Sequence, residues 1–141
     1  MLEAIGLTKR YEDGELALDG LTLKVEPGEI FCMFGANGAG KTTTINLFLG
    51  FLPPTSGQAL IEGVDVAKDP LQAKRHVSFV SENVMLYGNF TAIQNLDYFS
   101  KLAGKRTLAK KDYAGVLDQV GLQKEAFDRR IKNFSKGMRQ K

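Results

Sequence analysis

The sequence predicts an α/β fold in which a strand-rich first half precedes a helical second half. Alternating apolar residues over 2–11 and 16–26 indicate two strands. In the second half, Thr91 and Gln94 are spaced as a capping box at the start of a helical pattern. The two domains that we expect are a sheet-containing core over residues 1–90 and a helical subdomain over residues 91–141.

The middle of the first half contains a short apolar run that is followed by glycines. Ile30–Phe34 has the pattern of a strand buried on both faces, and Cys32 within it fits a small buried hydrophobe. Residues 35–40 predict a glycine-rich turn, and 41–50 predict a helix that ends at its glycine. The other elements expected here are a strand at 58–62, a helical turn at 70–75 and a strand at 76–81.

Two helices account for the second half. Ile93, Leu96 and Phe99 recur at helical spacing after the capping box, and Gly104 provides a stop. Residues 108–120 repeat this pattern before a further glycine. The change from strands to helices indicates a sheet core followed by a helical subdomain.

Composition places the chain among globular proteins that fold without disulfides. Its single cysteine excludes an internal disulfide framework and favours a reducing compartment. Neither a membrane-spanning stretch nor a signal-peptide pattern occurs.

The net charge of +3 combines an acidic excess over residues 1–100 with a basic excess over 101–141. Because no aromatic platform lies among the basic residues, a solvated face is favoured over a nucleic-acid-binding one.

The glycine-rich segment carries the clearest chemistry. Gly35–Thr42 fits G-x-x-x-x-G-K-[ST] at every fixed position. Glycines let the backbone wrap so that several amides point at a polyphosphate, and the following helix adds its N-terminal dipole. Lys41 would reach the β- and γ-phosphates, and the Thr42 hydroxyl would ligate Mg²⁺. The alternative, a glycine turn with an incidental lysine, is disfavoured by the flanking strand and helix patterns.

A phosphate-binding loop alone leaves GTPases and small-molecule kinases open, although the absence of Asn-Lys-x-Asp weakens the GTPase alternative. Further segments closely resemble ATP-binding subunits of ABC transporters and follow the order found in that family. These segments are 7–11, 17–21, 25–30, 49–57 and 134–140. The resemblance covers essentially the whole chain. It implies a P-loop NTPase core with an antiparallel β subdomain and the start of a helical subdomain.

The resemblance assigns roles to single residues of the first half. Tyr11 corresponds to the aromatic residue that stacks on adenine, although an ordinary strand-end tyrosine is the alternative. Glu82 stands where the family usually has the glutamine of the Q-loop, which contacts the metal and the attacking water. A glutamate can ligate Mg²⁺ but cannot donate an amide hydrogen bond. His76 precedes the position of the family's switch histidine and is expected to be an ordinary surface or strand-end residue.

The last residues resemble the family signature, commonly Leu-Ser-Gly-Gly-Gln. Ser135 and Gly137 are retained, whereas Lys136 and Met138 depart from it. In the family this segment contacts the γ-phosphate of ATP held by the opposite subunit. A Ser-Lys-Gly-Met version with a glutamate in the Q-loop is similar to subunits of ABC-2-type exporters. Ser135 is in any case expected to cap the helix that follows it.

The site residues that follow from the motif and the resemblance fall into three groups. The catalytic candidates are Lys41 and Glu82. The metal ligands are Thr42 and Glu82. The ATP-binding candidates are Tyr11, Gly35, Asn37, Gly38, Ala39, Gly40, Lys41, Thr42, Thr43, Ser135 and Gly137.

The resemblance implies a subunit whose head-to-tail dimer couples ATP hydrolysis to export by a separate membrane permease. Such a subunit would be cytoplasmic and would be held at the inner face of the membrane by the permease, with ATP and Mg²⁺ as cofactors and no nucleic acid as a partner. The alternatives are a non-catalytic nucleotide-binding fragment and a soluble ABC-type ATPase of translation or DNA repair.

No apolar run ending in Asp-Glu, which the family uses as its Walker B strand, occurs in these residues, and the switch histidine is also missing. We therefore expect this chain alone to bind ATP without hydrolysing it efficiently. We also expect the edge of Ile30–Phe34 to be unpaired. The chain should then aggregate or pair with a second copy through that edge.

Overall fold

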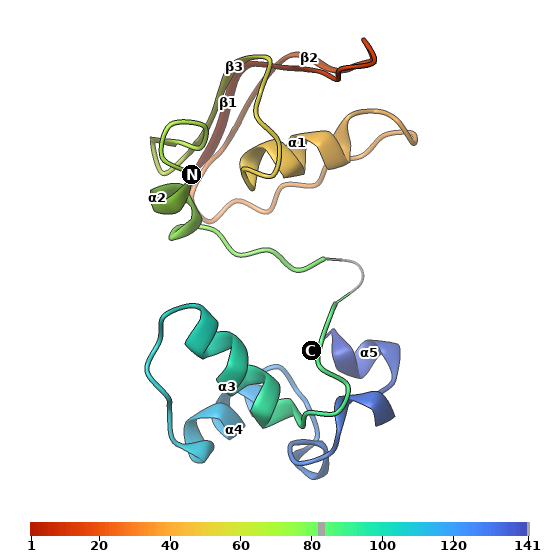
Figure 1. Cartoon of the computed structure of the whole chain (residues 1–141), viewed down its shortest axis with the longest axis vertical. Helices are drawn as coiled ribbons and strands as arrows, with labels where there is room; N and C mark the ends of the chain where they lie inside the picture. Colours follow the sequence, from red (N-terminus) through yellow and green to blue (C-terminus); the bar gives the residue numbers. More distant parts are fainter. Residues whose placement is uncertain (82–83, 141) are drawn as a thin grey trace. The chain divides into compact units, whose positions relative to one another are not determined.

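The computed structural model describes residues 1–81 and 84–140, which divide into two compact units, Met1–Phe79 and Val80–Lys141. Figure 1 shows the strands in the first unit and most of the helical residues in the second. Each unit has its own cluster of buried apolar side chains. The predicted order, a sheet followed by helices, is confirmed.

The division between the two compact units falls before residue 80, whereas the sequence analysis placed a domain boundary after residue 90. Hydrogen bonds tie the intervening segment to the second unit. The Tyr87 amide donates to Asn95 Oδ1 at 2.9 Å. The Ile131 amide donates to the Phe90 carbonyl, also at 2.9 Å. This segment lacks helical periodicity, and the sequence pattern therefore did not assign it to the helical part.

The first unit is built on a four-stranded antiparallel sheet. Its strands are β1 (Leu2–Arg10), β2 (Leu16–Val25), β3 (Ser56–Ile61) and β4 (Val64–Asp65), in the order β2-β1-β3-β4. Leu2 lies opposite Val25 on one side and Ile61 on the other. Ala4 and Leu7 of the central strand are fully buried. The strands predicted at 2–11, 16–26 and 58–62 are confirmed.

Two helices accompany this sheet, α1 (Lys41–Phe48) and α2 (Pro70–Lys74). Leu47 and Phe48 of α1 are buried in one cluster with Ala4, Leu7 and Ile61 of the strands. Each fully buried aliphatic side chain of this kind stabilises the fold by about 1.5–3 kcal/mol. The packing of α1 on the sheet fixes the position of the residues that immediately precede it.

Two predicted strands are absent from the structure. Ile30–Phe34 and residues 76–81 have no strand assignment, and no strand of the described sheet pairs with either segment. Ile30 is 92% exposed, Phe34 is 89% exposed, and Cys32, predicted to be buried, is also exposed. A strand requires a neighbour for its backbone hydrogen bonds. An apolar pattern predicts burial but cannot supply that neighbour.

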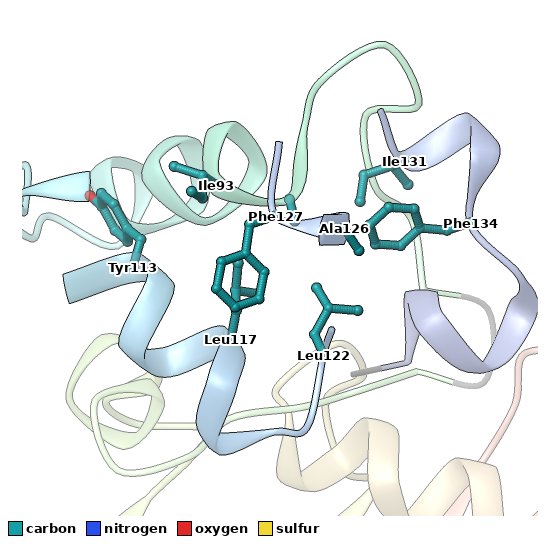
Figure 2. Packing of buried hydrophobic residues seen from close by; sticks show 9 residues of the cluster. Ile93, Tyr113, Leu117, Leu122, Ala126, Phe127, Ile131 and Phe134 are labelled. Atoms are coloured by element: carbon teal, nitrogen blue, oxygen red, sulfur yellow. The ribbon is translucent and has the colours of Figure 1, made fainter. Parts of the chain in front are cut away.

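The second unit consists of α3 (Ala92–Leu102), α4 (Lys110–Gln119) and short turns that lead to α5 (Lys136–Arg139). The 3₁₀ turns are η1 (Lys124–Ala126) and η2 (Ile131–Asn133). Figure 2 shows their apolar side chains meeting those of α3 and α4. No helix in the described parts of the chain has the length and apolarity that crossing a membrane requires.

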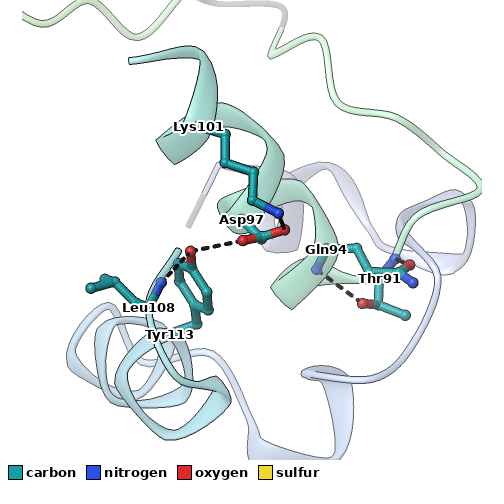
Figure 3. Close-up of polar contacts among 6 residues, drawn as sticks. All are labelled: Thr91, Gln94, Asp97, Lys101, Leu108 and Tyr113. Carbon is teal, nitrogen blue, oxygen red and sulfur yellow. Dashed lines mark hydrogen bonds and ion pairs between the residues drawn. The ribbon is translucent and has the colours of Figure 1, made fainter. Parts of the chain in front are cut away.

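Polar contacts fix the ends of α3 and α4. Thr91 and Gln94 form the predicted capping box, which Figure 3 shows in part. The Tyr113 hydroxyl donates to Asp97 Oδ1 at 3.0 Å, and Lys101 Nζ lies 2.7 Å from Asp97 Oδ2. The hydrogen bond from Lys101, with a further one from Tyr113, lowers the pKa of Asp97 although desolvation opposes the shift.

The lowered pKa of Asp97 predicts a pH-dependent contribution to stability. Because the pKa is lower in the folded state, the contribution is present above the unfolded value of about 3.9 and is lost as the pH falls through the folded value. We expect Asp97→Asn to lower the urea midpoint at about pH 7, and this difference to close in acid. Asp118→Asn, which removes an exposed acid of α4, should change the midpoint little at either pH. An Asp97→Asn deficit that persisted in acid would contradict this account.

The exposed segment Ile30–Phe34 predicts self-association. Antiparallel pairing centred on Cys32 would place Ile30 opposite Phe34, and the two Cys32 residues would face each other at a distance that a disulfide can span. We expect sedimentation velocity to show dimers or larger species that dissociate on dilution. Oxidation should cross-link them through Cys32, and Ile30→Lys should suppress association. A monomer that persisted at every concentration would contradict the prediction.

Candidate phosphate-binding site

The glycine-rich segment 35–40 connects the exposed run Ile30–Phe34 to the first residue of α1. Within it, the Ala39 amide donates to the Ala36 carbonyl at 3.2 Å, which closes a tight turn. Residues 35–39 are exposed, and only Gly40 is buried. The loop therefore presents its backbone to solvent while its last residue is held against the sheet.

Gly40 is the position at which the loop touches β2. Its φ angle is 79°, and a Cβ atom built there would lie 2.6 Å from the carbonyl oxygen of Ala17. Both observations disfavour a side chain, because the left-handed conformation is strained for other residues and the 2.6 Å contact is with a backbone atom, which could give way only if the strand shifted. The second fixed glycine of the motif is thus required by the packing of α1 on the sheet.

The start of α1 is open toward an anion. Gly40, its N-cap residue, makes no side-chain cap, and no acidic residue lies in the first turn. The first amides of a helix have no partner within the helix and carry the positive end of its dipole. Lys41 Nζ donates to the Gly35 carbonyl at 2.7 Å and to the Ala36 carbonyl at 2.6 Å. The ammonium group therefore lies over the loop, where it adds positive charge.

Three consecutive threonines in α1 have different surroundings. Thr44 is buried and its hydroxyl donates to the Gly40 carbonyl at 2.9 Å. Thr43 Oγ1 lies 3.3 Å from the hydroxyl of Tyr11. The Thr42 side chain is exposed, and no described residue hydrogen-bonds to its hydroxyl. Of the three hydroxyl groups, that of Thr42 is the one that remains free to bind a metal ion.

Tyr11 follows β1 and lies near the loop. Its hydroxyl contact with Thr43 fixes the ring beside the first turn of α1. Lys9 Nζ lies 5.7 Å from the centre of the ring and donates to the Pro53 carbonyl at 2.8 Å. The sequence predicted Tyr11 as a site residue, but it gave no signal for the contacts made by Lys9 or for the part played by the Ala17 carbonyl.

Ser135 and Gly137 belong to the second unit, whereas the phosphate-binding loop belongs to the first. Ser135 Oγ accepts a hydrogen bond from the Met138 amide at 3.2 Å, so the predicted cap of α5 is confirmed. A Cβ atom at Gly137 would meet nothing within 4 Å, and the backbone there is open to close approach.

Two other predicted positions need separate mention. Glu82, predicted as a catalytic and metal-binding residue, lies outside the described residues. His76 is exposed in the turn that follows α2, and its amide donates to the Ala73 carbonyl at 3.0 Å. It is a surface residue as predicted, although the strand expected there is absent. Within residues 1–81 and 84–140, no group of three His, Cys, Asp or Glu residues could hold a metal ion.

Two curated relatives align with most or all of the chain. The linearmycin resistance ATP-binding protein LnrL of Bacillus subtilis is 36% identical over 142 residues, which cover 100% of this chain and 45% of LnrL. The probable multidrug ABC transporter ATP-binding protein YbhF of Escherichia coli is 42% identical over 79% of this chain and 19% of YbhF. The chain thus spans less than half the length of these relatives.

Solved structures reproduce the fold. An ATP-binding subunit of an ABC transporter matches 99% of this chain and 58% of its own, with a TM-score of 0.81 and 29% identity. A dimeric ATP-binding cassette in a post-hydrolysis state with ADP and Pi matches 99% of this chain with a TM-score of 0.75 and 24% identity. The family profile described as ABC transporter matches residues 18–141. The fold is that of an α/β P-loop NTPase, and the chain belongs to the ABC transporter family.

Proposed function

We propose that this chain binds ATP with Mg²⁺ and forms the phosphate-binding part of the ATP-binding subunit of an ABC exporter. The observation that carries the proposal is the loop held by Gly40 at the open N-terminus of α1, with the Lys41 ammonium group beside it. Unpaired helix amides and a fixed cation together favour a polyanion over a neutral ligand.

Different groups of the loop would bind different parts of a triphosphate. The backbone amides of residues 35–40 and of the first turn of α1 would donate to phosphate oxygens. Lys41 now donates to two loop carbonyls, and its ammonium group would exchange these for the outer phosphates. This exchange replaces neutral acceptors with charged ones, which make stronger hydrogen bonds.

The surroundings of Thr42 and Tyr11 fit the remaining parts of MgATP. The free hydroxyl of Thr42 would ligate Mg²⁺, a cation that prefers oxygen ligands and usually keeps several waters. Tyr11 is fixed by Thr43 and would stack on the base. Since Lys9 lies over the Tyr11 ring, an adenine would use the opposite face or displace the ammonium group.

The role in export rests on the relatives and on the signature residues. LnrL is named for linearmycin resistance, and YbhF as part of a probable multidrug transporter. In our proposal, Ser135 and Gly137, which lie at the start of α5, approach the γ-phosphate of ATP bound by a second copy. A separate membrane permease would hold the subunit at the cytoplasmic face, and substrate choice would belong to that permease.

Hydrolysis by the chain of 141 residues is expected to be slow. Phosphoryl transfer depends on positioned water and on metal-centred charge stabilisation. These residues contain no apolar run that ends in paired carboxylates.

Two alternatives remain, a nucleotide-binding module that does not catalyse and a soluble ABC-type ATPase. The exporter is favoured because both named relatives are transport or resistance proteins.

Lys41→Ala tests the phosphate site. The variant should weaken ATP binding by about ten- to a hundredfold, the equivalent of one charge-assisted hydrogen bond. It should weaken AMP binding much less, because AMP lacks the outer phosphates. Titration calorimetry of both nucleotides measures the difference. Lys68→Ala removes an exposed lysine of the same unit and serves as the control. Equal losses for ATP and AMP would refute the assignment.

Steady-state phosphate release tests the expectation on hydrolysis. We expect the chain to retain ATP affinity while its Mg²⁺-dependent turnover stays near that of Lys41→Ala, because both lack part of the machinery that stabilises the transition state. Substantial turnover that Lys41→Ala abolishes would show that the described residues suffice for catalysis. The hypothesis that the chain is a nucleotide-binding module without catalytic activity would then be wrong.

A further inference from the structure

The end of α3, the connection to α4 and the first two residues of α4 are together strongly basic. Between Asp97 and Asp112 the chain carries five Lys or Arg residues and no acidic residue. All of the residues from 101 to 111 are exposed. The five basic residues are Lys101, Lys105, Arg106, Lys110 and Lys111. We refer to residues 101–111 as the basic loop.

Ion pairs neutralise only part of this charge. Lys101 pairs with Asp97 at 2.7 Å, and Lys110 pairs with Asp128 at 2.9 Å. Lys105, Arg106 and Lys111 form no ion pair with any described residue. These three side chains therefore leave a local positive field that falls off within about 10 Å at moderate salt.

The basic loop also exposes apolar side chains. Leu102, the last residue of α3, is 67% exposed, and Leu108 is 45% exposed. Neither belongs to the buried cluster of the second unit or to the residues packed against it. Exposed leucines among basic residues are the combination that favours the boundary between lipid headgroups and acyl chains.

The two ends of the basic loop are tied together. The Leu108 amide donates to the Tyr113 hydroxyl at 3.1 Å, and that hydroxyl donates to Asp97, which also binds Lys101. Figure 3 shows this chain of contacts from Leu108 to Lys101. Tyr113 is itself buried in the core of the unit. These hydrogen bonds hold Leu108 near Asp97 and Lys101. Lys105, Arg106 and Lys111 take no part in them.

We infer that the basic loop is a contact site for an anionic membrane surface, in addition to the nucleotide site. Anionic headgroups would accept from Lys105, Arg106 and Lys111, and Leu102 would enter the interface beside them. A nucleic acid is disfavoured because residues 101–111 contain no aromatic residue on which bases could stack.

The test is co-sedimentation of the full chain with vesicles, without nucleotide. We expect binding to phosphatidylcholine vesicles that contain phosphatidylglycerol, weak binding to phosphatidylcholine alone, and release by high salt. The triple variant Lys105→Gln, Arg106→Gln and Lys111→Gln should lower the partition coefficient by about a hundredfold, from roughly fivefold for each basic residue. Leu102→Gln should lower it several-fold with the charge unchanged.

A matched control removes three charges elsewhere in the same unit. Lys124→Gln, Arg130→Gln and Lys132→Gln change exposed residues that form no ion pair with the described residues. This variant should retain most of the binding, and far-ultraviolet circular dichroism should show that both triple variants stay folded. If the two triple variants lost vesicle binding equally, the binding would depend on net charge alone and not on the basic loop. That result would overturn the inference.

Two other results would overturn it as well. The first is failure of the unmodified chain to bind anionic vesicles at low salt. The second is binding to single-stranded RNA that is as tight as vesicle binding at the same salt and equally sensitive to the triple variant of the basic loop. That result would identify a nucleic-acid site instead.

Discussion

The contact between Gly40 and the Ala17 carbonyl is the constraint on which the phosphate-binding loop depends. The phosphate-binding loop ends at Gly40, α1 begins at the next residue, and the Ala17 carbonyl of β2 lies against Gly40. A methyl group at residue 40 would overlap with that carbonyl. The helix approaches so closely because Leu47 and Phe48 are buried against β1 and β3. The amides at the start of α1 are therefore held in place by the hydrophobic core before any ligand arrives. Preorganisation of this kind lowers the entropy lost on binding.

Local sequence signals were sufficient where the partners of an element are near in the chain. The strands β1 and β2 pair with each other, and the capping box of α3 lies within a single turn. The glycine-rich motif likewise specifies a turn and a helix start, and both are present in the structure, whereas the binding roles of Lys41 and Thr42 stay predictions. In each of these cases, the residues that decide the structure are part of the pattern itself.

The predictions that the structure did not reproduce concern segments whose structure depends on residues distant in the sequence. Ile30–Phe34 was predicted as a buried strand because every residue in it is apolar, yet Ile30 and Phe34 are among the most exposed apolar residues described. Whether such a run becomes a strand depends on backbone partners that are distant in sequence. The division between the compact units differs from the expected boundary for a related reason, since the hydrogen bonds of Tyr87 and Phe90 to the second unit are tertiary contacts. The role of Ala17 was invisible because its backbone, not its side chain, makes the contact.

The separate cores of the two units have a consequence for cooperativity. Leu47 and Ile61 are buried in one cluster, whereas Leu117 and Phe127 are buried in another. Each cluster is formed within one unit, so a substitution in a cluster acts first on the unit that contains it. A core substitution in the helical unit could release Ser135 from its fixed position while the phosphate-binding loop stays intact. The proposed signature contact and the proposed nucleotide site thus depend on different hydrophobic cores.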